Sequence, residues 1–398
     1  MPIFVTMKKT LINLRPFRDF LKSGMAGGII LLGCVVISLL IANSSAGPAF
    51  EKLLATEWGP SEHLRYSLLA WINDGLMAIF FLLVGLEIKR ELVEGELSSP
   101  KKAALPILAA VGGAVVPALI FTFLNRGTPT AQGWGIPMAT DIAFALAIIT
   151  LLGKRVPASL KIFLAALAIV DDLLAILVIA VFYTTELHFM YLLYAAGLVA
   201  LLVVFNKAGV KKLYFYLIPG LFIWYFIHHS GIHATIAGVL VAMTLPTTPD
   251  ATESPLEKLE HLLLKPVNFV IMPLFALVNT NIRFDEEMTG GLFTPLGLGI
   301  ILGLVIGKPI GISLVSRLAV KLGISALPEG TGWSHIFGVG LLAGIGFTMS
   351  VFISILSFAG HELPLSQAKF SILLASVLAG ILGSIFLSSL HQTKKKIN

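Results

Sequence analysis

Two adjacent aspartates, Asp171 and Asp172, lie in the middle of an apolar run that extends from residue 162 to residue 182. At about 1.5 Å per helical residue, the pair would lie roughly 14 Å inside a hydrocarbon core about 30 Å thick. An ionised carboxylate at that depth costs several kcal/mol unless it is neutralised or faces a polar cavity. The pair therefore predicts a site that handles charge inside a membrane.

Few other charged residues fall within the apolar segments. Asp141 is deep, Asp74 is a further candidate, and Lys308 is the only deep base. Ionisable residues inside a membrane are functional by default, although a structural ion pair or a position at a helix end is the alternative for each. The excess of acids over bases favours a cation as the bound species.

The composition is that of an integral membrane protein. Hydrophobic residues make up 57% of the 398 residues, 13% are charged, and the mean hydropathy is +0.92. These values exclude a soluble domain. The single cysteine, Cys34, excludes a disulfide framework and a cysteine metal site. The net charge of +6 is explained by its distribution along the loops, so we expect no nucleic-acid partner, and no motif calls for a cofactor.

The apolar pattern predicts an all-α membrane protein with about twelve transmembrane helices. If the N-terminus is cytoplasmic, 22 of the 28 lysines and arginines lie on the inner side, five on the outer side and Lys308 within a segment. This bias places both termini in the cytoplasm and supports an even number of spans. We expect a single domain over residues 1–398, with the lipid bilayer as its partner. The predicted segments are 24–42, 66–88, 103–124, 133–152, 158–183, 189–206, 213–228, 231–245, 261–280, 293–316, 335–358 and 366–390.

Two of the predicted segments are interrupted. Residues 133–141 contain two glycines and Pro137 just before the polar pair Thr140 and Asp141, and residues 338–350 contain four glycines before Thr348. Interrupted helices at corresponding positions of two halves indicate the ion site of a transporter, because unwound backbone offers carbonyls to a cation. Exposed half-helix ends carry partial charges, which Asp141 and Lys308 could compensate. Close helix packing through small residues is the alternative explanation of the glycines.

Seven stretches of this chain resemble the NhaA family of sodium/proton antiporters. They follow the family order over nearly the whole chain, so the resemblance is specific. It departs at residues 278–281, where the family usually has smaller residues than Val-Asn-Thr-Asn. The matching stretches are Trp71–Phe81, Gly85–Leu92, Ala139–Ile148, Ala168–Ile176, Gly231–Gly238, Gly307–Ile312 and Leu342–Ser350.

The resemblance implies a fold of twelve helices with two inverted-topology repeats, near 103–183 and 293–390 in this sequence. The two broken helices would cross near the membrane midplane. The family forms homodimers through a β-hairpin in the first outer loop, which the loop 43–65 could supply here.

The resemblance also assigns the site. It implies that Asp172 is the main ion-binding carboxylate for Na⁺ and that Asp171 is its partner in proton exchange. It places Thr140 and Asp141 at the unwound crossing, with Lys308 compensating nearby charge and pairing with Asp171 during the cycle.

A second group of residues matches the family's pH-sensing region at the cytoplasmic face. A solvated network of salt bridges at helix ends is the alternative for each of them, and packing is the alternative for the histidine in the 231–238 stretch. The candidates are Glu87, Arg90, Glu91, Glu257, Glu260, His261 and His233.

These features together predict a secondary transporter that exchanges cytoplasmic Na⁺ or Li⁺ for external H⁺ in the inner membrane of a bacterium. Burial favours the neutral forms of acids and amines, whereas Na⁺ favours ionised carboxylates, so protons and the ion compete for one site. A site that loses two protons to load one Na⁺ moves net charge, so we expect the exchange to be electrogenic.

Three other functions fit less well. A sodium-coupled symporter of an organic anion would need another buried base besides Lys308. An ATP-driven pump would need a phosphate loop, but the string 303–309 has the wrong spacing and Pro309 in place of Ser or Thr. A channel is disfavoured because buried carboxylates that bind tightly suit exchange better than rapid conduction.

Overall fold

The computed structural model describes residues 15–59, 64–184, 187–247 and 253–396. Two features of the sequence lie partly outside these ranges: Lys8 and Lys9 of the basic N-terminus, and residues 60–63 of the first outer loop. Within them the chain is almost entirely helical, as predicted. Helices are expected because hydrocarbon offers no partner for backbone N–H and C=O groups, which must then bond within their own segment.

The first part of the chain, up to residue 247, contains most of the short interruptions. Its helices and 3₁₀ or π turns are α1 (Arg15–Ala42), α2 (Gly47–Leu54), α3 (Leu68–Ala70), η2 (Trp71–Leu76), α4 (Met77–Val93), α5 (Pro100–Leu124), η3 (Ala131–Met138), α6 (Ile142–Leu151), η4 (Gly153–Arg155), α7 (Ala158–Phe182), α8 (Phe189–Lys207), α9 (Tyr214–His229) and α10 (Ile236–Thr244).

The second part begins at residue 253 and ends in the longest helix. Its elements are α11 (Pro255–Pro266), η5 (Val267–Ile271), α12 (Met272–Asn279), α13 (Glu286–Gly290), η6 (Gly291–Phe293), α14 (Pro295–Leu302), η7 (Gly303–Gly307), α15 (Lys308–Lys321), α16 (Trp333–Ala343), α17 (Phe347–Ser357) and α18 (Glu362–Lys396).

Length and composition do not by themselves confirm the predicted twelve spans. In the described ranges, eight helices are long and apolar enough to cross a membrane, and up to ten if each of two bent pairs counts as one span. The bends are 113° between α1 and α2 and 48° between α16 and α17. Helix α9 has 16 residues and α10 only nine, which is shorter than the ~17–25 residues that a straight span needs. The apolar pattern registers hydrophobicity but not where a helix is cut, so the count of twelve stays a prediction.

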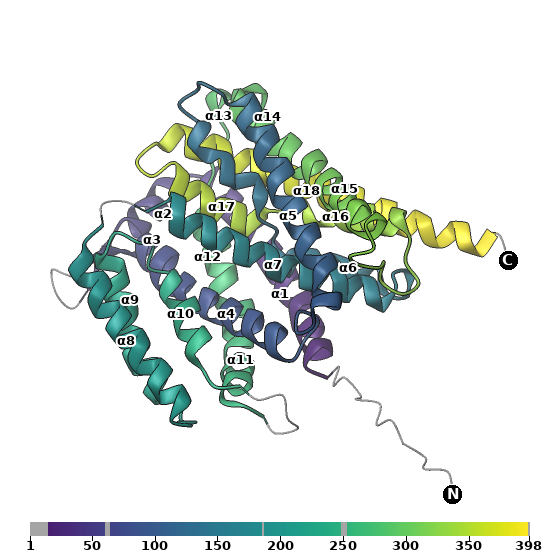
Figure 1. Cartoon of the computed structure of the whole chain (residues 1–398). Helices are drawn as coiled ribbons and strands as arrows, with labels where there is room; N and C mark the ends of the chain where they lie inside the picture. The colour runs from purple at the N-terminus through teal and green to yellow at the C-terminus, as the bar shows by residue number, and fades with distance from the viewer. Residues whose placement is uncertain (1–14, 60–63, 185–186, 248–252, 397–398) are drawn as a thin grey trace, which may run out of the picture.

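Two hydrophobic cores hold the helices together. The larger one joins α5, α7 and the helices from α14 to α18, and the smaller one joins α8, α9 and α10 to α4 and the start of α11. Figure 1 shows α8 and α9 side by side at one edge of the molecule, with α5, α15, α16 and α18 gathered on the other side. The two interrupted segments lie within the larger core.

The first outer loop contains the one strand pair of the described residues. Strand β1 (Glu57–Trp58) pairs antiparallel with β2 (Tyr66–Ser67), so that Trp58 lies opposite Tyr66. The second strand begins one residue after the loop predicted at 43–65. The backbone carbonyl of Trp58 also accepts a hydrogen bond of 2.9 Å from the indole of Trp71, which ties the hairpin to the start of η2.

Candidate functional site

The two adjacent aspartates lie midway along α7. Asp171 and Asp172 are each 1% exposed, and the Oδ1 atom of each has no hydrogen-bond partner in the described part of the chain. Buried side-chain oxygens are normally satisfied, so two neighbouring exceptions require an explanation. A site that exchanges a proton for a cation provides one, because both species bind to such oxygens.

Lys308 pairs with only one of the two aspartates. Its Nζ atom lies 2.5 Å from Oδ2 of Asp171 and also donates to the backbone carbonyl of Met138, at the C-terminal end of η3. Lys308 is fully buried and opens α15, directly after the π turn η7. It therefore neutralises one carboxylate and compensates the negative end of a short helix.

Glycines bring α15 close to α5 near Lys308. A Cβ atom on Gly311 would lie 2.1 Å from the carbonyl oxygen of Gly112, and one on Gly112 would lie 2.4 Å from the carbonyl oxygen of Gly311. Any larger side chain at either position would push the helices apart. Close packing through small residues, which was the alternative explanation of glycines elsewhere in the sequence, thus operates here to position the lysine.

Asp141 lies at the N-termini of two helices at once. Its Oδ1 atom caps α6 by accepting a 3.0 Å hydrogen bond from the N–H of Phe144. Its Oδ2 atom accepts a 3.1 Å bond from the N–H of Thr348 and a further bond from the hydroxyl of the same residue, at the start of α17. The carboxylate is therefore stabilised by the positive ends of both helices.

The two interrupted segments bond directly to each other, and we call residues 139–141 with 344–346 the crossing. The N–H of Asp141 donates to the carbonyl of Ile345 over 2.6 Å, and the Thr140 hydroxyl donates to the carbonyl of Ala343 over 2.8 Å. A Cβ atom on Gly346 would lie 2.1 Å from the Ser350 hydroxyl and 3.1 Å from the carbonyl oxygen of Ala139. The crossing therefore requires glycine at position 346.

These contacts compensate the negative charge of two of the three aspartates that are buried in the described ranges. The negative charge of Asp171 is matched by Lys308, and that of Asp141 by two helix ends. Asp172 has no ion pair in the described residues. An isolated carboxylate in a low-dielectric interior must be protonated or bind a cation.

The oxygen atoms at this site suit a hard cation. Carboxylate, carbonyl and hydroxyl groups surround the aspartates and the crossing, and these are the ligands preferred by hard metal ions. The described residues contain no group of three or more His, Cys, Asp or Glu side chains arranged to hold a metal ion. The oxygen ligands at the site are therefore of the kind that binds hard cations.

Four of the predicted pH-sensing residues meet between α4 and α11. Arg90 contacts Glu260 at 2.5 Å and Glu91 at 3.1 Å, and Glu87 interacts electrostatically with all three. Glu87 and Glu260 are buried, 5% and 4% exposed, which the sequence did not indicate. Three acids thus share one arginine, so the cluster of Glu87, Arg90, Glu91 and Glu260 holds more negative than positive charge.

The other three pH-sensing candidates have their hydrogen bonds and ion pairs outside this centre, although Glu257 and His261 still interact electrostatically with Glu260. Glu257 forms a capping box with Ser254 at the N-terminus of α11, and His261 lies 3.0 Å from Glu253 at the surface. His233 contacts Asp74 at 3.4 Å and Thr235 at 2.8 Å, in the loop between α9 and α10.

Several polar contacts near the site were not anticipated from the sequence. Thr348 was noted only as part of a glycine-rich stretch, yet it bonds Asp141 twice. Asn73 and Asn279 exchange hydrogen bonds of 3.3 and 2.7 Å across 206 residues of sequence. Asn279 belongs to the stretch where the sequence departs from the family pattern. A hydroxyl directly after a helix break was an available signal for Thr348, whereas nothing local marked the asparagine pair.

The known proteins named below are all sodium/proton antiporters, and their matches to this chain extend over nearly its whole length. Residues 18–387 match the family model described as Na⁺/H⁺ antiporter 1. The chain is 62% identical over 397 residues to the Na⁺/H⁺ antiporter NhaA 2 of Flavobacterium johnsoniae, covering 99% of this chain and 97% of that protein. It is 51% identical to NhaA of Dechloromonas aromatica, covering 95% and 97%, and 45% identical to NhaA of Helicobacter pylori, covering 94% and 95%. The resemblance inferred from the seven stretches is thereby confirmed, and the chain belongs to the Na⁺/H⁺ antiporter 1 family.

Proposed function

We propose that this protein exchanges cytoplasmic Na⁺ or Li⁺ for external H⁺. The observation that carries the proposal is the unequal state of the two adjacent aspartates, since Asp171 is paired with Lys308 and Asp172 has no charged partner. The relatives named above are all called Na⁺/H⁺ antiporters, which agrees with this function. The alternative of an anion symporter receives no support, because Lys308, whose side chain is fully buried, is already paired with Asp171.

The exchange follows from competition at one site. A cation that binds between Asp171 and Asp172 needs both carboxylates ionised, so Asp172 must release a proton first. The cation also draws Asp171 away from Lys308, and a buried lysine that loses its counter-ion releases its own proton. Two protons therefore leave for each ion that enters, and the cycle moves one net charge. No cofactor is needed, because the protons and the ion account for all the charge that moves.

The crossing provides the movable element in this proposal. The segment α5–α7 and the segment α14–α18 each contain an interrupted middle part, and the two interruptions bond to each other. This correspondence supports two inverted repeats, near 103–183 and 293–390. It also agrees with a count of twelve helices, in which α1, α9, α10 and the α16–α17 pair each add one to the eight long spans. Rocking of one repeat against the other would expose the aspartates to each side in turn.

The setting of the protein follows from charge and topology. We place it in the bacterial inner membrane with both termini in the cytoplasm, because 22 of its 28 basic residues fall on one side. The β1–β2 hairpin offers an edge through which two copies could form a homodimer. The cluster of Glu87, Arg90, Glu91 and Glu260 is the proposed pH control.

Purified protein in proteoliposomes tests the function directly. An imposed Na⁺ gradient should change the internal pH, reported by a trapped dye, and reversing the gradient should reverse the sign of the change. The same vesicles with K⁺ in place of Na⁺ are the control. Equal responses to Na⁺ and K⁺, or none to either, would contradict the proposal.

A further inference from the structure

An apolar crevice opens behind the crossing, on the outer surface of the helix bundle. It lies between α1, α6, the start of α17 and α18, and its volume is about 490 Å³. Pockets of roughly 300–1,000 Å³ are large enough to hold small molecules. The lining residues are Leu32, Val35, Phe144, Ile148, Ile345, Phe347, Leu373, Ser376, Val377, Gly380, Ile381, Ser384 and Ile385.

The crevice offers nothing polar to a ligand. Its lining contains two hydroxyls, and both are engaged within the protein. Ser376 accepts a 3.1 Å bond from the N–H of Phe347, and Ser384 donates a 2.6 Å bond to the carbonyl of Gly380. The occupant must therefore be hydrocarbon, because a polar molecule would leave its own groups unsatisfied.

The rim of the crevice faces the lipid. Leu32, Val377, Ile381 and Ile385 are between 48% and 64% exposed, and α18 is one of the helices long and apolar enough to span a membrane. The surrounding medium at this surface is thus acyl chain, not water. A lipid tail can enter the crevice from the side without crossing a polar barrier.

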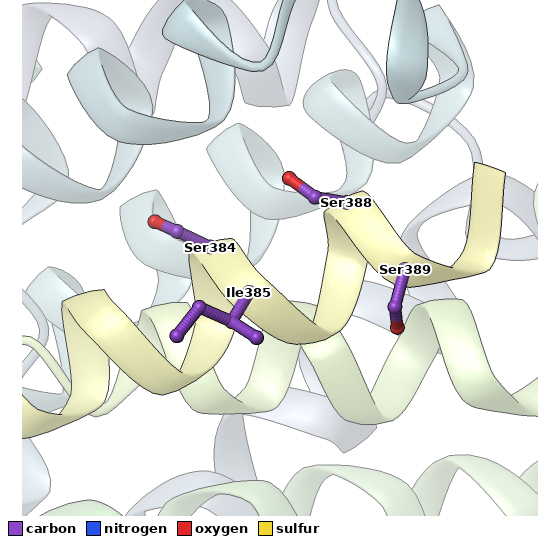
Figure 2. Close-up of a pocket in the computed structure, with 4 residues that line it drawn as sticks. All are labelled: Ser384, Ile385, Ser388 and Ser389. Carbon is purple, nitrogen blue, oxygen red and sulfur yellow. The ribbon is translucent and has the colours of Figure 1, made fainter. Parts of the chain in front are cut away.

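The crevice continues along α18 into a more polar hollow. The hollow has a volume of about 390 Å³ and is lined by Ser384, Ile385, Ser388 and Ser389. Ser384 and Ser388 are one helical turn apart and point to the same side of α18, whereas Ser389 points to the other side (Figure 2). An apolar slot that leads to a hydroxyl-bearing end of the helix matches the order of a lipid tail and its headgroup.

Positive charge lies against α18. The turn η4 packs against α18 and contains the exposed residues Lys154 and Arg155, and Lys161 donates to the carbonyl of Gly153 in the same turn. Basic residues at the cytoplasmic surface attract anionic headgroups. The headgroup that fits here is therefore anionic and belongs to the cytoplasmic leaflet.

We propose that the crevice is a binding site for one anionic phospholipid, with an acyl chain between α1, α6 and α18 and the headgroup beside η4. The chain would contact Phe144 and Phe347, whose rings pack edge to face with centroids 5.4 Å apart. The N–H of Phe144 also donates a hydrogen bond to Asp141. A lipid chain packed against the Phe144 ring would therefore help to hold the start of α6 at the crossing.

Two tryptophan variants on neighbouring residues test the tail site. Ile381→Trp fills the crevice, whereas Leu382→Trp adds the same bulk at a position that is 44% exposed but outside the lining. Delipidated protein is titrated with phosphatidylglycerol, and bound lipid is counted by native mass spectrometry. We expect one tightly bound lipid in wild type and Leu382→Trp, and affinity about tenfold weaker in Ile381→Trp, equivalent to about 1.4 kcal/mol. Equal affinity in all three proteins would overturn the proposal.

A second pair of variants tests the headgroup. Wild type should prefer phosphatidylglycerol over phosphatidylcholine, and Lys154→Ala with Arg155→Ala should abolish that preference. Lys207→Ala with Lys211→Ala, at the basic end of α8, should retain it. Persistence of the preference without Lys154 and Arg155 would overturn the headgroup assignment.

The same measurements distinguish a lipid from a second copy of the chain. If Ile381→Trp converts a dimer into a monomer and leaves lipid binding unchanged, the crevice is a protein interface and the proposal is wrong. If Ile381→Trp does not give a monodisperse protein, Val377→Trp in the lining and Leu378→Trp outside it provide the same comparison.

Discussion

The ammonium group of Lys308 lies 2.5 Å from Asp171, whereas Asp172, the next residue along α7, has a buried Oδ1 atom without a hydrogen-bond partner among the described residues. Two identical side chains on one helical turn are therefore in different electrostatic environments. Asp171 can exchange one positive partner for another, and Asp172 can only gain a proton or a cation. The variants of these two residues should accordingly differ in stability even where they agree in activity.

Asp172→Asn should abolish exchange and leave the fold intact. The amide cannot release a proton or supply a negative charge, and the substitution breaks no ion pair. We expect proteoliposome exchange at background level and a melting temperature equal to or above that of wild type, because the amide is neutral without binding a proton or a cation. Normal Na⁺-dependent proton release from the purified variant would show that the site lies elsewhere.

Asp171→Asn should abolish exchange and also destabilise the protein. Removing one partner of a buried pair typically costs about 3–5 kcal/mol, because the remaining charge is left uncompensated. Lys308→Ala removes the other partner of the same ion pair and should lose activity or stability at every pH. The double variant Asp171→Asn with Lys308→Met should recover most of the stability but none of the exchange, as measured by thermal unfolding and by Na⁺-driven pH change. A double variant no more stable than the single ones would mean that the pair does not determine stability here.

Asp141 should matter through the helix ends that it caps. Asp141→Asn retains an oxygen that can cap α6 but replaces the acceptor that faces Thr348, so we expect a loss of about 1.5–3 kcal/mol from the charged hydrogen bonds. Thr348→Val removes only the hydroxyl and should cost less. Thr348→Ser, which keeps it, is the control. The melting temperature should be highest for Thr348→Ser, lower for Thr348→Val and lowest for Asp141→Asn. A different order would show that Asp141 does not stabilise the start of α17.

Glu260→Gln should shift the pH dependence of exchange and preserve its maximum. Glutamine mimics a permanently protonated acid beside Arg90, which fixes the cluster in its low-pH charge state. Because protons compete with Na⁺, the pH at which exchange appears should move upward. Glu57→Gln is the matched control, because Glu57 pairs with Arg65 at the surface, away from the cluster, and its loss should change neither the maximum nor the profile. Uniform loss of activity in Glu260→Gln with an unshifted profile would favour a structural salt bridge.

Exchange of two protons for one Na⁺ should be sensitive to voltage. Transport in proteoliposomes should build a membrane potential and accelerate when valinomycin and K⁺ collapse it. The exchange rate under the same Na⁺ gradient, measured without the ionophore in the same preparation, is the baseline. An equal rate with and without valinomycin would indicate electroneutral exchange, in which one of the two aspartates does not transport a proton.

The sequence determined what is local and periodic. Long apolar runs predicted helices, because a chain in hydrocarbon has no other way to satisfy its backbone. The positions of Asp171, Asp172 and Asp141 within such runs marked them as costly and therefore as candidates for function. Glycines with Pro137 marked one break and four glycines marked the other, although α5 continues through Pro106 and Pro117.

The tertiary structure decided which of these groups meet, and how. Nothing local to Lys308 specifies a choice between Asp171 and Asp172, which depends on the approach of α15 to α5 at Gly311 and Gly112. The second role of Asp141 depends on Thr348, 207 residues later, and the separation of Glu257 from Arg90 depends on the capping box at α11. These contacts join residues distant in sequence, so they are set by helix packing, which the apolar pattern of a membrane protein leaves undefined because lipid-facing and protein-facing surfaces are equally hydrophobic.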